Sequence, residues 1–153
     1  MGKIKGVAAA CAAVSLLVSV PAGAYSINQA EKLRKLDIML MVTGLRCRTT
    51  ADNFQPDYGR FATSHLAELN AASNTLKADL AQRYGAAGAN RALDRLSTTM
   101  ANSYGGGHPW LNCAQLRTVA RNLATAQGDA PLVAAADQLL SPSGSPQLAL
   151  ALR

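Results

Sequence analysis

The stretch that most constrains the fold is Leu33–Cys47, the most continuously apolar part of the chain outside its N-terminus. Its apolar side chains recur at spacings of three and four residues, and further apolar residues widen this face on both sides. A helix that is apolar on so much of its circumference is expected at the centre of a bundle. Gly44 lies inside this pattern, where glycine costs about 1 kcal/mol relative to alanine, so we expect a neighbouring helix to approach closely there.

The first 24 residues have the order of a secretory signal peptide. A basic start is followed by an uncharged apolar run and then by the small residues Ala22 and Ala24. The apolar run of about 14 residues is shorter than the roughly 20 that span a bilayer, which argues against a membrane anchor. A lipid anchor on Cys11 is the weaker alternative, because most of the apolar run follows that residue. We expect cleavage near Ala24, export to the periplasm or the extracellular space, and no stable membrane insertion afterwards.

Cleavage would leave one domain with enough chain for a core of its own. We expect residues 25–140 to form this domain and residues 141–153, which begin Ser-Pro-Ser-Gly-Ser-Pro, to form a flexible tail. Two of the 15 basic residues lie in the leader, so 13 remain against nine acidic residues, a net charge of +4. These charges are scattered along the chain, which favours a solvated basic surface over a nucleic-acid-binding one.

Two cysteines remain outside the leader, Cys47 and Cys113. A disulfide is the expected state of such a pair in an oxidising compartment. It would close a loop of 66 residues, for which the chain-entropy model gives at most roughly 4 kcal/mol. Cys47 acting as a nucleophile with His65 or His108 is the alternative, and the export signal favours the structural bond.

Helical spacing runs through the rest of the chain, and no segment shows the alternation of a half-buried strand. We expect an all-α, four-to-five-helix bundle in which the disulfide ties the end of the first helix to the start of the fourth. Ser26 can cap the first helix. The second helix is expected over 56–84, bending if anywhere at 70–74, and a stop and loop are expected at 84–88. The later helices are expected over 91–104, 113–126 and 131–140, with caps at Asn90, Asn112 and Asp129.

The loop His108-Pro109-Trp110 is the best candidate for a recognition surface. It follows three glycines, which are costly to order. A tryptophan on such a loop could insert into a partner, although folding back over the disulfide is slightly favoured. His65, on the apolar stripe of the second helix, is a further candidate for this surface. A buried histidine satisfied by a hydrogen bond is the favoured interpretation there.

Motifs with a defined chemistry are missing from the sequence. It contains no His-Glu-x-x-His, no Cys-x-x-Cys and no phosphate-binding loop. Its carboxylates are too sparse to indicate a metal site in a helix bundle. Glu68 with a second carboxylate could form a glycan hydrolase pair, but nothing nearby distinguishes it from a solvated helix residue. We therefore expect no cofactor, no metal site and no catalytic residue.

Three local features carry a resemblance: Gly44-Leu45-Arg46-Cys47, the Tyr58-x-x-Phe61-x-x-x-His65 spacing, and the second cysteine at Cys113. Together with the leader, they make residues 25–153 resemble small exported helical proteins of Gram-negative bacteria that have no assigned activity. In architecture alone, the chain is also similar to small periplasmic chaperones and to immunity proteins of secretion systems.

The function expected from these patterns is a non-catalytic periplasmic or secreted binding or interaction protein. Its partner would be a protein or a small molecule and not a nucleic acid. One alternative is a small cell-envelope hydrolase that uses Glu68, His65 or Asp57. Another is a periplasmic chaperone or an immunity-type protein, although a chaperone would be expected to carry a charged disordered tail.

Overall fold

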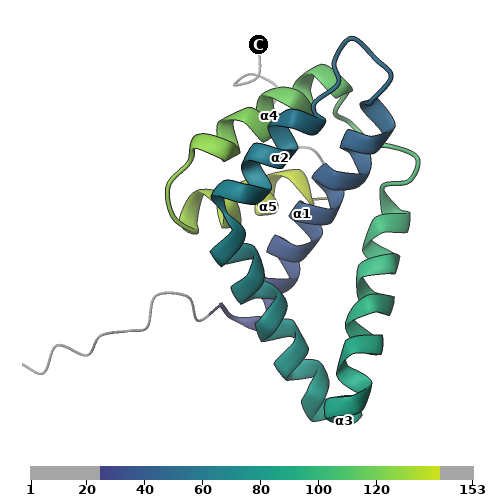
Figure 1. Cartoon of the computed structure of the whole chain (residues 1–153), viewed down its shortest axis with the longest axis vertical. Helices are drawn as coiled ribbons and strands as arrows, with labels where there is room; N and C mark the ends of the chain where they lie inside the picture. The colour runs from purple at the N-terminus through teal and green to yellow at the C-terminus, as the bar shows by residue number, and fades with distance from the viewer. Residues whose placement is uncertain (1–24, 142–153) are drawn as a thin grey trace, which may run out of the picture.

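The computed structural model describes residues 25–141, and Figure 1 shows their arrangement. The expected leader, residues 1–24, and the expected tail from residue 142 onward lie outside the described residues. Within 25–141 the chain forms five α-helices and no strand, which confirms the all-α bundle. The helices are α1 (Ile27–Cys47), α2 (Gln55–Ser64), α3 (Leu66–Ser103), α4 (Cys113–Thr125) and α5 (Ala130–Leu139).

The arrangement of the helices centres on α1. Figure 1 shows α3 as a V with α1 in its opening, while α2 and α4 lie side by side across the other flank of α1. α5 packs against α1 as well. Among the described residues, no helix is both long enough and apolar enough to cross a bilayer.

The central position of α1 follows from its sequence. Ser26 accepts a hydrogen bond from the backbone N–H of Gln29, and the Gln29 side chain accepts one from the backbone N–H of Ser26, so the helix begins with a capping box. Its buried positions cover most of its circumference, which confirms the expected central helix. They are Ala30, Leu33, Leu36, Ile38, Met39, Leu40, Thr43, Gly44 and Cys47.

The close approach expected at Gly44 is made by an aromatic ring instead of a helix backbone. A Cβ atom at Gly44 would lie 3.4 Å from the ring of Phe54, the fully buried residue just before α2. A methyl group at this position would be in ordinary van der Waals contact with the ring, whereas a longer side chain would meet it. The small residue therefore lets the Phe54 ring pack closely on α1.

The expected second helix is interrupted at a different place from the one predicted. The chain leaves helical geometry at His65, where φ is −114° and ψ is 24°. Residues 70–74, the expected place for a bend, lie inside α3. The break lets the buried His65 ring reach α4 and pack near Phe61, with ring centroids 5.5 Å apart. A tertiary contact therefore decides where this helix ends, and local helix propensity does not.

The prediction of a loop at 84–88 is also wrong, because a single residue makes the turn. Gly85 has φ 72° and ψ 162°, and helical structure continues on both sides of it. Such backbone angles are essentially restricted to glycine. Asn90 therefore lies inside α3 and caps nothing. The two arms that meet at Gly85 pack on each other through a small core of Leu80, Ala89 and Ala92.

The last two helices begin close to where they were expected. Asn112 caps α4, and its side chain and that of Gln115 form a second capping box. This confirms the predicted cap. Asp129 takes the N-cap position of α5, but its side chain makes no capping hydrogen bond within the described residues. Pro131 in the first turn supports the start of α5 instead.

Candidate binding site beside the disulfide

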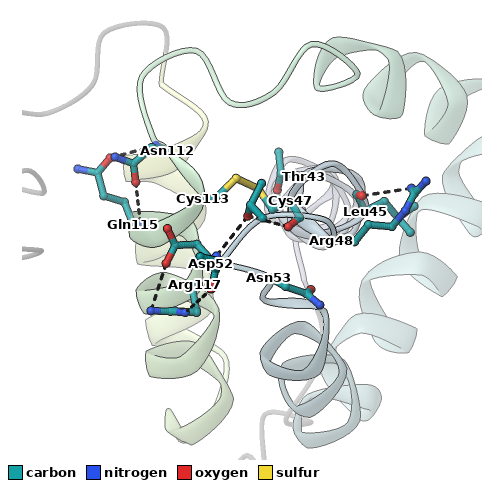
Figure 2. Close-up of a disulfide and its surroundings, with 12 residues drawn as sticks. Thr43, Leu45, Cys47, Arg48, Asp52, Asn53, Asn112, Cys113, Gln115 and Arg117 are labelled. Carbon is teal, nitrogen blue, oxygen red and sulfur yellow. Dashed lines mark hydrogen bonds and ion pairs between the residues drawn. A yellow bond between two sulfur atoms is a disulfide. The ribbon is translucent and has the colours of Figure 1, made fainter.

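The disulfide joins the last residue of α1, Cys47, to the first residue of α4, Cys113 (Figure 2). Their Cα atoms are 5.8 Å apart, and the bond encloses 66 residues of chain separation, as predicted. The segment that follows Cys47 is held to the end of α1 by a hydrogen bond and to α4 by an ion pair. Thr50 donates a hydrogen bond to the Cys47 carbonyl over 2.8 Å, and Asp52 pairs with Arg117 of α4 at 3.2 Å. The junction is therefore cross-linked by one covalent bond and by polar contacts.

A cavity of about 260 Å³ lies against this bond, between the end of α1, the start of α4 and the glycine-rich loop. Both cysteines form part of its wall. Its volume falls just below the roughly 300–1,000 Å³ of common small-molecule pockets. The remaining lining residues are Thr43, Arg46, Gly106, Gly107, His108, Leu111, Asn112 and Leu116.

Arg46 positions the glycine-rich loop over the cavity. Its Nη1 donates to the carbonyl of Gly105 over 3.3 Å. Gly107 has a φ of 107°, and a Cβ atom there would lie 3.3 Å from the Arg46 Nε, so this position requires glycine. Sequence reasoning did not select Arg46 as a site residue. The signal that could have found it is its position next to Cys47 in the last turn of α1.

His108 is the candidate recognition residue that the structure places in the cavity wall. Its Nε2 donates to the Leu139 carbonyl over 3.1 Å, and its Nδ1 accepts from the backbone N–H groups of Trp110 and Leu111, at 3.4 and 3.2 Å. Burial lowers the pKa of His108, while the bond to Leu139 opposes this shift. The His108 ring is therefore neutral, and its hydrogen bonds connect the loop to α5.

The rest of the loop folds back on the core. The Trp110 ring meets the His108 ring edge-on, with centroids 4.6 Å apart, and packs beside the core. Its Nε1 is buried and has no hydrogen-bond partner among the described residues. Trp110 does not line the cavity, and Pro109 is the exposed tip. Of the three loop residues, His108 faces the cavity and Pro109 faces solvent.

His65 does not belong to a recognition surface, because it is only 2% exposed. Its Nε2 lies 2.7 Å from the carbonyl oxygen of Leu123, so it satisfies a backbone acceptor of α4. Among the described residues its Nδ1 atom has no hydrogen-bond partner, and a carboxylate oxygen of Glu68 lies 3.8 Å from it. A ring enclosed in this way cannot contact a partner unless α2 and α4 separate. The buried, hydrogen-bonded ring agrees with the favoured interpretation of His65, and its candidacy for a recognition surface is not supported.

The site can hold a ligand but offers no activated nucleophile. The two sulfur atoms are bonded to each other, so neither is a thiolate. Among residues 25–141, no three His, Cys, Asp or Glu side chains gather in a way that could hold a metal ion. Comparisons of the chain with protein-family models, with curated proteins and with solved structures find no match. The resemblance to small exported helical proteins therefore stays a prediction.

Proposed function

We propose that the chain is an exported, non-catalytic binding protein whose ligand enters the cavity beside the disulfide. One observation carries this proposal: the polar groups around the cavity are already engaged within the protein. Thr43, Arg46, His108 and Asn112 each make at least one hydrogen bond to another residue. Groups held in this way give a pocket a fixed shape, which lowers the cost of ordering it on binding.

The state of His108 supports binding over proton transfer. A general base needs a ring nitrogen within hydrogen-bond reach of the proton that it abstracts. Both nitrogens of His108 are occupied, one by the Leu139 carbonyl and the other by backbone N–H groups of the loop. The ring can therefore set the position of the loop without taking part in a reaction.

The leader supports the exported location, and the disulfide fits an oxidising compartment. Export and disulfide formation can both be tested by expressing the full chain in a Gram-negative host and analysing the periplasmic extract by mass spectrometry. Under denaturing conditions, we expect the mass of residues 25–153 less two hydrogens. A mass that retains residues 1–24 would contradict export.

Binding is tested on the same material by native mass spectrometry and by a fragment screen with amide NMR. We expect a retained ligand or a fragment that shifts the amides of the cavity lining. Arg46→Gln should weaken this binding, because it releases the loop. Arg48→Gln is the matched control, since Arg48 is exposed and, within residues 25–141, its side chain bonds only the carbonyl of Leu45 three residues earlier. Equal binding by both variants, or no ligand from either method, would contradict the proposed site.

A further inference from the structure

A second hollow lies between α2 and α4, away from the disulfide. It is an open groove of about 540 Å³. Small residues line its α2 and α4 sides, and a Cβ atom at Gly59 would meet nothing within 4 Å. The groove is lined by Pro56, Gly59, Arg60, Thr63, Ser64, Arg121, Ala124 and Thr125.

Two arginines from opposite sides of this groove converge on one buried carboxylate. Asp57 is 4% exposed and lies in the first turn of α2. Arg60 pairs with its Oδ1 atom from the next turn of α2, and the Nε of Arg121 reaches the same oxygen from α4 over 3.4 Å. This shared carboxylate fixes the position of both guanidinium groups relative to the groove.

The guanidinium groups keep most of their donors free for a ligand. A guanidinium carries five N–H donors in a planar fork, and the pairing with Asp57 uses few of them. The side chains of Arg60 and Arg121 remain 63% and 59% exposed. They make no other ion pair with the residues that the structure describes, so outward-facing donors border an accessible hollow.

The charges of this cluster indicate the class of ligand. Two guanidinium groups and one carboxylate leave an excess of one positive charge. A single carboxylate would neutralise that excess, whereas a phosphate carries about two negative charges at neutral pH. The planar guanidinium fork also matches carboxylate geometry. We propose that the α2–α4 groove binds the carboxylate group of a ligand, held by Arg60 and Arg121 over the buried Asp57.

A titration of the ¹⁵N-labelled protein, followed by amide NMR, tests this site. The probes are N-acetylglutamate N-methylamide, which has a side-chain carboxylate, and N-acetylalanine, which has a terminal one. N-acetylglutamine N-methylamide is the neutral control of nearly the same shape. We expect saturable shifts at the amides of Gly59 and Ala124 with at least one carboxylate probe. The stronger probe identifies the source, a side chain or a chain end. Equal shifts with the glutamine control, or with sodium chloride at matched ionic strength, would overturn the proposal.

Three variants separate binding from folding. Gly59→Leu keeps both arginines and Asp57 but places a large side chain in the groove, so it should abolish the shifts. Arg121→Lys keeps a charge beside Asp57 but loses the fork, so we expect binding to weaken at least tenfold. Arg91→Gln, on the far arm of α3, should leave binding unchanged. A melting curve and a circular dichroism spectrum verify that each variant is folded. Unchanged binding by folded Gly59→Leu and Arg121→Lys would overturn the site.

Discussion

The Nε2 nitrogen of His65 lies 2.7 Å from the backbone carbonyl oxygen of Leu123, 58 positions further along the chain. The bond connects the junction between α2 and α3 to the last turns of α4. It is buried, so neither group has water as an alternative partner. A buried acceptor that loses its donor pays the full cost of desolvation, which makes this contact a structural one.

Replacement of His65 by alanine should therefore destabilise the fold strongly. The change leaves the Leu123 carbonyl without a donor and opens a cavity beside Phe61. We expect the free energy of unfolding to fall by about 2–4 kcal/mol, from the unpaired acceptor and the lost packing together. Urea unfolding followed by circular dichroism measures it. Lys77→Ala, on an exposed face of α3, should stay within about 0.5 kcal/mol. A similarly small effect of His65→Ala would show that the bond contributes little.

The disulfide gives a second stability prediction. Replacing both Cys47 and Cys113 by serine should lower the free energy of unfolding by about 2–4 kcal/mol, because the unfolded chain regains the freedom of the enclosed loop. The melting temperature of the double variant is compared with that of oxidised protein whose bond has been verified by mass. Equal melting temperatures would mean that the fold holds this junction without the covalent bond.

Alanine substitutions at two glycines should change the stability of the fold in opposite directions. Gly59 lies inside α2 with open space around its Cα, so Gly59→Ala should stabilise the fold by about 0.5–1 kcal/mol through helix propensity. Gly85 has φ 72° and ψ 162°, and Gly85→Ala should destabilise it by about 1–3 kcal/mol. Denaturant midpoints of the two variants, measured side by side, provide the check. A gain in stability at Gly85 would contradict the single-residue turn.

Burial lowers the pKa of His108 in the folded state below its ordinary value of 6.5. In the pH range between the lowered pKa and 6.5, the unfolded chain therefore binds more protons than the folded one. The contribution of His108 to stability is fully present above this range and is lost as the pH falls through it. We expect the denaturant midpoint to decrease on acidification across this window.

The matched variant for the pH prediction is His108→Gln, which cannot titrate. The difference in stability between the native protein and this variant should shrink as the pH falls below 6.5. Unfolding curves at closely spaced pH values, at constant ionic strength, measure that difference. A difference that stays constant with pH would show that His108 has the same pKa in both states.

Sequence patterns predicted the elements whose determinants are local. The stripe of α1 and the capping residues Ser26 and Asn112 follow from spacing and side-chain chemistry. The pairing of the two cysteines follows from the export that the leader predicts. The break at His65 could not be predicted in this way, because it depends on a carbonyl of α4. The sharp turn at Gly85 was also missed, since the glycines at 85 and 88 indicate a change of chain direction without showing how many residues the turn needs.

The candidate sites were less accessible to sequence reasoning than the fold. The pattern selected His108, which lines the cavity, whereas the only signal for Arg46 was its place next to Cys47, which was not used. The groove between α2 and α4 was missed entirely, because Asp57, Arg60 and Arg121 come together only when the two helices pack. Scattered arginines look like a solvated surface until tertiary structure shows which of them share a partner.

The position of the Cys47–Cys113 bond also determines how the molecule would respond to tension. A force applied between Tyr25 and Ser141 would pass covalently from the end of α1 into the start of α4 through the sulfur atoms, and the backbone of α2 and α3 would lie outside this path. The 66 residues of enclosed separation correspond to roughly 220–240 Å of extended chain, which stretching releases only after reduction. Until the bond is reduced, the protein can therefore be extended only as far as a much shorter chain, and α2 and α3 stay within the loop that the disulfide closes.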